Sequence, residues 1–559
     1  MNRAQRIYVY VVLAVTAVLT TVGVSQLAGT LIDEAWPGKV IQGGPGSNVA
    51  LGIALLAVAG PVWLFHWRLA DRKAAGSASE LNHWLRQAYL ALLSAISLGV
   101  AAFAVAGVLT ALLGGRPESI DGGQVSRTAF WGAVWAFHWR VARQTWQPGH
   151  AGRSLHRWYL YVASAAALAV FVIALARLFG DLLSAAYDSV YPSGVLHSSG
   201  VWTDGAQKAL ATAIVTAVTW AWHWRVGARA DKGSTLRDVV VTAVAAGAGV
   251  IGMVAAGLVL HTLFRTSLGT VGETTASRLA GLTGPVGLWL AAAPVWLYYI
   301  LLLLRPARAL EPSYASSSAT WAYRYFAMGA GLGALAATAV TGIALLAGVI
   351  VPSGDVVFEG PGAAREAVAT VLATLVLGAA VWLPLVRSIR RAHDDQDRQN
   401  VGRLYLFAIT GAGLLSAVGG AASLIYILLN DALNGRFGAA TVDSARWAFG
   451  AALTGATVAA LHARAIPGGV REAVSEAVPA RRKRVMLIAP RGAGQFKTTL
   501  EQALGRSVEW RVDLTGETDF GAIGVPPDAA VIAANIERLP GRAAVILWTP
   551  EGARLASHD

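Results

Sequence analysis

Histidine, tryptophan and arginine recur together in this chain at a spacing that could support ligand chemistry. Residues 62–68 read V-W-L-F-H-W-R, and similar segments follow at 134–140 and 219–225. On a helix, the two tryptophans and the histidine of each segment fall on one face, at positions i, i+3 and i+4. Paired imidazoles can ligate haem iron, and facing copies could line a site for a quinone, a headgroup or another small ligand. The candidate cofactor-binding residues are His66, His138 and His223.

The same residue types also suit the boundary between a membrane and water. An indole combines an apolar body with one N–H donor, and a guanidinium just beyond it can reach lipid phosphate in a fork geometry. Position and composition both fit this role, so we favour anchoring over ligand binding, with the bilayer and its anionic headgroups as partners. The residues assigned to this interfacial signature are Trp63, Trp67, Arg68, Trp135, Trp139, Arg140, Trp220, Trp224 and Arg225.

Three weaker copies of the signature follow, and they limit what the histidines can do. The copies lie at 295–299, 381–387 and 458–464, and Tyr299 and Leu385 stand where two of them should have histidine. A ring of six equivalent ligands is therefore excluded, whereas a pair formed by the second histidine with the first or the third stays open. The chain has no cysteine, which excludes disulfides and thiolate chemistry. We predict no resident cofactor and no metal site.

Few other polar groups lie within the apolar segments. Arg177 and Asp181 are spaced i, i+4, which predicts an ion pair near the end of a helix. No carboxylate lies at the middle of an apolar segment, which argues against a proton-coupled carrier with an acidic relay. Small-residue runs such as 329–334 and 411–413 predict close helix packing. No combination of residues indicates a catalytic site, and we do not expect an enzyme.

Long apolar segments must position all of these residues. The 559-residue chain is 55% hydrophobic and 14% charged, whereas soluble domains carry about 25% charged residues. A helix needs roughly 20 residues to cross the hydrocarbon core of a bilayer. The sequence predicts an all-α polytopic membrane protein of about twelve spanning helices, paired in six hairpins, with a small C-terminal α/β domain. The predicted helices are 5–31, 47–68, 84–113, 125–144, 156–186, 204–227, 236–265, 277–305, 320–350, 364–388, 402–430 and 444–464.

Positive charge predicts the orientation of these helices. Lys and Arg are concentrated on the side that holds the N-terminus, as in Arg68, Arg72 and Lys73, and are sparse in the opposite loops. Cationic loops are retained in the cytoplasm, so we expect a multi-pass protein of the plasma membrane with both termini cytoplasmic. The net charge of +13 is then an orientation signal and an attraction to anionic lipids, and we expect no nucleic-acid partner.

The spacing of the six signatures indicates an internal repeat. Their histidine positions, 66, 138, 223, 299, 385 and 462, are separated alternately by shorter and longer intervals. Two hairpins therefore form one unit, present three times in parallel orientation, at 1–150, 151–310 and 311–466. Four-helix units ending in V-W-x-x-H-W-R resemble the bacterial membrane family called domain of unknown function 5671. The resemblance implies a polytopic fold in the bacterial inner membrane, and it implies no activity.

The composition changes after the last signature. Residues 467–483 form a polar, basic linker, and 484–559 alternate between strand and helix patterns, which predicts a small cytoplasmic sheet with covering helices. The segment 490–499 resembles a phosphate-binding loop, but Phe496 stands where that loop needs glycine before its lysine. We therefore predict a structural module or one that binds a cytosolic protein, without nucleotide chemistry, and a glycine turn that opens a helix and binds an anion or a partner stays open. Strands are predicted at 484–489, 508–514 and 543–548, and helices at 496–504 and 528–539.

Two main classes of function, and a third, are consistent with these features. One is a non-catalytic scaffold, sensor or accessory subunit whose C-terminal domain binds a cytosolic partner. The other is a transporter, or a protein that binds lipid or a small ligand between its repeats; a redox protein with haem or quinone is a third. We favour the first class, because no transport or catalytic constellation is evident. A map of internal cavities should distinguish the first two classes.

Overall fold

The computed structural model describes most of the chain, and the statements that follow concern the described residues. These are 2–35, 45–144, 151–190, 202–228, 231, 234–269, 275–304, 314–350, 361–392, 396–466, 484–489, 494–504, 507–512, 528–538, 543–549 and 552–558. The predicted basic linker at 467–483 and the first residues of the phosphate-loop-like segment, 490–493, lie outside them.

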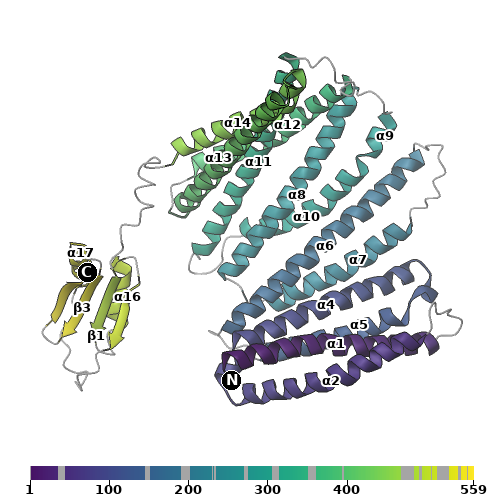
Figure 1. Cartoon of the computed structure of the whole chain (residues 1–559), viewed down its shortest axis with the longest axis vertical. Coiled ribbons are helices and arrows are strands. Elements are labelled where there is room, and N and C mark those ends of the chain that lie inside the picture. The colour runs from purple at the N-terminus through teal and green to yellow at the C-terminus, as the bar shows by residue number, and fades with distance from the viewer. Residues whose placement is uncertain are drawn as a thin grey trace. The chain divides into compact units, whose positions relative to one another are not determined.

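Long helices in pairs form the first of two compact units, Met1–His462, and the second unit is Ala463–Asp559. Figure 1 shows the pairs following one another in chain order, from α1 and α2 to α13 and α14. We number these pairs hairpins 1 to 6: α1–α2, α4–α5, α6–α7, α8–α10, α11–α12 and α13–α14. The end of a hairpin where its two helices are joined is called the turn end, and the opposite end, which carries the tryptophan-rich segment, is called the signature end.

The helices of the first unit have the following bounds: α1 Arg3–Ala35, α2 Pro45–Ala75, α3 Ala78–Leu81, α4 Trp84–Leu113, α5 Gly122–Gln144, α6 Ala151–Val190, α7 Asp204–Ala221, α8 Thr235–Ser267, α9 Thr275–Ala280, α10 Thr283–Leu304, α11 Tyr314–Ile350, α12 Pro361–Arg391, α13 Gln396–Leu433 and α14 Ala439–Arg464. The short helix α3 was not expected from the sequence, and the predicted helix 277–305 is divided into α9 and α10. A π-helical turn, Trp222–Gly227, continues α7 through the third signature.

Nine helices in the described part are long and apolar enough to cross a membrane. This finding agrees with a polytopic membrane protein of the predicted helical class. The three other predicted spans are helical as well, but α5, α7 and α14 do not meet that measure of length and composition. Each of these three helices contains charged or polar residues that lower its mean hydropathy, such as Gln124 and Arg127, Asp204 and Lys208, or Asp443 and Arg446. The number of twelve spans therefore stays a prediction.

Glycine brings neighbouring helices together at some positions of the predicted small-residue runs and not at others. A Cβ atom on Gly413 would lie 2.8 Å from the backbone nitrogen of Ala459, and one on Gly331 would lie 3.0 Å from that of Trp382. At these two crossings, backbone packs against backbone as predicted. Gly333 and Gly411, in the same runs, would meet nothing within 4 Å.

The C-terminal unit contains a four-stranded sheet with the order β2-β1-β3-β4. Strand β1 pairs in parallel with β2 and β3, whereas β4 is antiparallel to β3. The small α/β region was predicted, and β4 was not, because its sequence lacks an apolar alternation. The elements are β1 Arg484–Ala489, α16 Gly494–Leu504, β2 Glu509–Val512, α17 Ala529–Arg538, β3 Ala543–Thr549 and β4 Gly552–His558.

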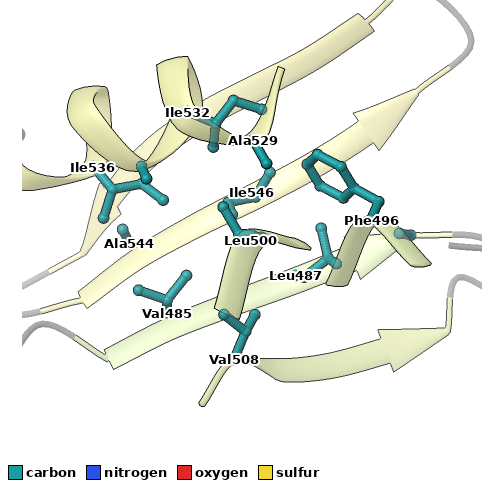
Figure 2. Packing of buried hydrophobic residues seen from close by; sticks show 12 residues of the cluster. Val485, Leu487, Phe496, Leu500, Val508, Ala529, Ile532, Ile536, Ala544 and Ile546 are labelled. Carbon is teal, nitrogen blue, oxygen red and sulfur yellow. The ribbon is translucent and has the colours of Figure 1, made fainter. Parts of the chain in front are cut away.

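One face of this sheet packs against both helices to form a core. Figure 2 shows Leu487 of β1 and Ile546 of β3 beneath Leu500 of α16 and Ile536 of α17. All four side chains are fully buried. Alternate residues of each strand and residues four apart on each helix supply this core, as strand and helix periodicities require.

Replacing Leu500 with alanine should destabilise the C-terminal unit by about 2–5 kcal/mol, because it removes a fully buried side chain and leaves a cavity. Hydrogen exchange of the full chain should show faster exchange in β1 and α16. The control is Val531→Ala, since Val531 is 56% exposed on α17 and its truncation should have little effect. Equal exchange in both variants would contradict the packing of this core.

Lys497, the lysine of the phosphate-loop-like segment, is engaged within its own helix. Its Nζ atom lies 2.9 Å from Oε1 of Glu501, and the same carboxylate accepts a hydrogen bond of 2.8 Å from the Val508 amide. The lysine, and then the amide, hold the pKa of Glu501 below its usual value. The stabilisation from this carboxylate is therefore present above its unfolded-state pKa and is lost as the pH falls through the lower folded-state pKa.

Candidate functional site

The signature histidines of hairpins 2 and 3 use both ring nitrogens in hydrogen bonds. In His138, Nδ1 lies 2.8 Å from the carbonyl oxygen of Val134 and Nε2 lies 3.0 Å from the hydroxyl of Tyr89. In His223, the corresponding distances to Thr219 and Tyr159 are 2.8 and 3.1 Å. A carbonyl oxygen only accepts, so Nδ1 carries the proton and Nε2 accepts from the tyrosine hydroxyl. These two imidazoles have no nitrogen left for haem iron.

A tryptophan of one hairpin extends this arrangement to the next hairpin. Trp135 of hairpin 2 donates from Nε1 to the hydroxyl of Tyr159 in hairpin 3, at 3.0 Å. That hydroxyl in turn donates to His223. Three buried or half-buried polar groups thereby satisfy one another across a hairpin boundary. The Trp135 N–H and the Tyr159 hydroxyl each donate one hydrogen bond, and these bonds stabilise the contact between hairpins 2 and 3 in a low-dielectric surrounding.

Related tryptophan–tyrosine bonds join the following hairpins. Trp220 donates to Tyr299 at 3.0 Å and so connects hairpins 3 and 4. Trp296 donates to Tyr323 at 2.6 Å and connects hairpins 4 and 5. The first tryptophan of the signature is therefore a bridge between hairpins in three consecutive junctions.

Hairpin 4 has valine and tyrosine where hairpins 2 and 3 have tyrosine and histidine, and the tryptophan of the preceding hairpin still finds a hydroxyl acceptor. Arg86 lies over the ring of Trp67, and Arg237 lies over the ring of Trp224, so the two arginines have matching places in hairpins 2 and 4. Tyr89 follows the first arginine by three residues, and Val240 follows the second. The valine has no hydroxyl, but Tyr299 occupies the signature histidine position and supplies one to the preceding tryptophan.

The histidines of the first and last hairpins keep only part of this pattern. His66 donates from Nδ1 to the carbonyl of Val62 at 2.8 Å, and its ring meets Tyr8 edge-on at 5.6 Å. His462 makes the same backbone bond at 2.9 Å. None of the three candidate cofactor-binding histidines lines either of the clefts described below. The described residues also contain no group of three or more His, Asp or Glu side chains that could hold a metal.

The other signature residues divide into buried rings and exposed charges. Trp139 and Trp224 are only 7% and 4% exposed, and they pack between helices. Trp63, Trp67, Trp135 and Trp220 are half-buried, whereas Arg68, Arg140 and Arg225 are exposed. Trp139 and Trp224 thus have a packing role beyond the interfacial one predicted from their residue type. Headgroup contact by the three arginines stays a prediction.

Sequence reasoning also missed two ion pairs at the signature end. Arg6 of α1 binds the buried Glu80 of α3, with Nη2 and Oε1 2.7 Å apart, and Arg157 of α6 pairs with Asp231. The hydroxyl of Tyr161 also donates to Asp231, at 2.8 Å. Both arginines and both acids are offset by the same interval, since 157 − 6 and 231 − 80 each equal 151. Aligning the repeats at that interval could have found these pairs, and it also aligns Tyr8 with Tyr159.

A large cavity, here called cleft 1, separates hairpins 2 and 3. Its volume is about 1320 Å³, and it is lined mainly by α4, α6 and α7. Its wall is rich in alanine and glycine, including Ala95, Gly99 and Ala163, and most of its other residues are apolar or threonine. Along α4 it extends from Ala88 to Ala111, which is about 35 Å at 1.5 Å per residue. The cleft is therefore about as long as the hydrocarbon core of a bilayer is thick, roughly 30 Å.

Polar side chains gather at the turn end of cleft 1. Arg116 pairs with Asp204 at 2.8 Å, and Arg127 lies 3.8 Å from Asp121. Arg177, Asp181 and Lys208 line the same end. The predicted ion pair between Arg177 and Asp181 is absent among the described contacts, which corrects the expectation from their spacing. Both residues face the cleft, and their spacing along the helix did not bring their charged groups within 4 Å.

A second cavity, cleft 2, separates hairpins 4 and 5. Its volume is about 480 Å³, and α8, α10, α11 and α12 line it. Trp289, Trp296 and Tyr323 are among its lining residues, and none of the described residues in its wall is charged. Tyr323 of cleft 2 and Tyr159 of cleft 1 hold matching places, because each accepts a hydrogen bond from the signature tryptophan of the preceding hairpin.

Comparison with protein families places both clefts between repeated regions. One family model matches the chain three times, over residues 6–133, 157–298 and 321–461. Each matched region contains two hairpins, so cleft 1 lies between the first and second regions and cleft 2 between the second and third. No curated protein and no solved structure matches the chain. Because the three tandem matches cover more than half of its length, the chain belongs to the family described as Domain of unknown function (DUF5671).

Proposed function

We propose that this protein is a non-catalytic membrane protein that binds membrane lipid in cleft 1. The observation that carries the proposal is a cavity of about 1320 Å³ between two repeated regions. Sites for drug-sized ligands usually have volumes of about 300–1,000 Å³, so the cleft is large for a compact soluble ligand. Its length and its apolar wall suit chains that run across a bilayer.

The distribution of polarity in the cleft supports an amphiphile over a wholly apolar ligand. The alanine- and glycine-rich wall offers a smooth surface to hydrocarbon, and the basic residues lie at one end only. A molecule with an apolar chain and a polar head satisfies both parts of the site. This reading belongs to the second of the two classes expected from the sequence, namely a protein with a ligand site between its repeats.

Placement in the plasma membrane with both termini cytoplasmic is part of the proposal. The excess of Lys and Arg at the signature ends supports it. A reporter fused after Gly122, at a turn end, and one fused after Asp559 should therefore lie on opposite sides of the membrane. Reporters that respond alike would contradict this orientation. In the cytoplasm, the C-terminal unit would be available to a protein partner.

Filling cleft 1 should remove a bound lipid, and the chain offers a suitable position. Gly99 lines the cleft, and a Cβ atom there would meet nothing within 4 Å. Gly99→Trp should therefore place an indole in the cavity without a backbone clash. Native mass spectrometry of the purified full chain should show one tightly retained lipid fewer than in the wild type.

Two matched variants control this experiment. Gly252→Trp fills cleft 2, and Gly247→Trp places the same side chain on helix α8 outside both clefts; neither glycine would have a Cβ contact within 4 Å. Gly247→Trp should keep the lipid complement of the wild type. If Gly99→Trp also keeps it, cleft 1 is not a lipid site and the proposed function is wrong.

A further inference from the structure

We propose that Arg177 and Lys208 bind the phosphate of a phospholipid whose headgroup carries one negative charge, such as a phosphatidylglycerol. This inference rests on the proposed function and names the head that cleft 1 selects. It concerns the turn end of the cleft, where basic residues on three helices and their connections meet.

Two of the four basic residues at this end already have acidic partners. The guanidinium of Arg116 is bound by Asp204, and it also donates to Gln207 at 3.3 Å. Arg127 is near Asp121. In contrast, neither Arg177 nor Lys208 has an ion-pair partner among the described residues, and both are exposed on the wall of the cleft. Their charges are the ones available to a ligand.

The packing of α6 on α7 places these two charges at the same depth. Leu178, next to Arg177, packs against Ala206 and Ala209, and Ala209 is next to Lys208. The two basic side chains therefore flank one helix–helix contact at the same level. A guanidinium and an ammonium at one level can bind two oxygens of a single phosphate, and the guanidinium can do so in a fork geometry.

Asp181 limits the charge that this end of the cleft can accept. It is the one acidic residue among the described residues of the wall, and its carboxylate lies 3.3 Å from the position that a Cβ atom on Gly205 would take. Together with Arg177 and Lys208 it leaves one net positive charge. That charge complements a phosphodiester, whereas a phosphate monoester with nearly two charges would be repelled by the carboxylate. The carboxylate can also accept a hydrogen bond from a headgroup hydroxyl.

The test measures which lipid the full chain retains from mixed micelles of equal parts phosphatidylglycerol, phosphatidylethanolamine and phosphatidic acid. The wild type should be enriched in phosphatidylglycerol. R177Q and K208Q should each reduce that enrichment about fivefold, the effect expected for one cation near a lipid headgroup. R177K and K208R keep the charge and should keep most of the preference. R436Q removes a basic residue from another turn end and should have no effect.

The outcomes separate this inference from the proposed function. If R177Q and K208Q keep the preference while Gly99→Trp loses its lipid, the headgroup assignment is wrong and cleft 1 still binds lipid. If the wild type prefers phosphatidylethanolamine and D181N removes that preference, the site recognises an ammonium and the assignment is also wrong. If D181N instead admits phosphatidic acid, the role of the carboxylate in limiting charge is supported. A protein that retains no lipid in any variant overturns both proposals.

Discussion

Replacing Tyr159 with valine should lower the free energy of unfolding by about 3 kcal/mol. The hydroxyl of Tyr159 accepts from Trp135 and donates to His223, so its loss leaves two polar groups without partners at a hairpin boundary. Each such group costs about 1–3 kcal/mol, and the missing ring adds a cavity. Unfolding of the purified protein in detergent, monitored by tryptophan fluorescence, measures the change.

A second substitution should recover much of this loss. His223→Tyr combined with Tyr159→Val reproduces the pair that hairpin 4 already uses, in which Val240 holds the place of the tyrosine, Tyr299 holds the place of the histidine, and Trp220 donates to Tyr299. The double variant should therefore be more stable than Tyr159→Val alone, by about 1–2 kcal/mol for the restored acceptor. Tyr426→Val is the matched control, since Tyr426 is 70% exposed on α13. A double variant no more stable than the single one would argue against a hydrogen-bonded junction.

The hairpins could be predicted from the sequence because their signals are local. An apolar stretch of membrane length followed by a signature marks the second helix of each pair, and the signature recurs six times. The alternating intervals between copies indicate the tandem repeat, and the motif that ends each unit indicates the family; the three matched regions confirm both. Neither step depends on how side chains from different hairpins meet.

The partners of the signature residues could not be found in this way. Tyr89 and Tyr159 lie 49 and 64 residues before the histidines that they bind. Near the end of an apolar helix, a tyrosine that binds histidine looks the same in sequence as one that faces headgroups. Trp139 illustrates the ambiguity, because its residue type fits a membrane boundary but its ring is buried between helices.

Cleft 1 was hidden for a different physical reason. Small residues permit two helices to approach, and they equally leave a gap where the helices do not. Gly331 and Gly413 lie where two helices meet closely, and Gly99 lies where a gap remains. Composition is the same in both cases, and the geometry of hairpin packing decides between them. The basic residues at the turn end were visible in sequence, but their common site depends on the contact between α6 and α7.

Helix α5 contains one glycine in close contact with α1 and another beside open space, so the difference between these two kinds of position can be measured within one helix. Gly122→Ala should destabilise the first unit by about 2–3 kcal/mol, because an added Cβ atom would overlap the carbonyl oxygen of Gly29 and lie 2.9 Å from Cβ of Ile32. The amide of Gly122 also donates to Asp33 at 2.7 Å, so a displaced backbone would weaken that bond as well. Backbone meets backbone here, and no flexible side chain can move aside.

Glycine-to-alanine substitution at Gly132, ten residues later on α5, should change the stability of the protein in the opposite direction. A Cβ atom on Gly132 would meet nothing within 4 Å. Alanine is favoured over glycine in a helix interior by about 0.5–1 kcal/mol, so Gly132→Ala should stabilise the protein slightly. Thermal unfolding of the two variants in one detergent would therefore place them on either side of the wild type. If Gly122→Ala proves neutral, α1 and α5 are not in backbone contact, and the packing of hairpin 1 against hairpin 2 must differ from the arrangement described here.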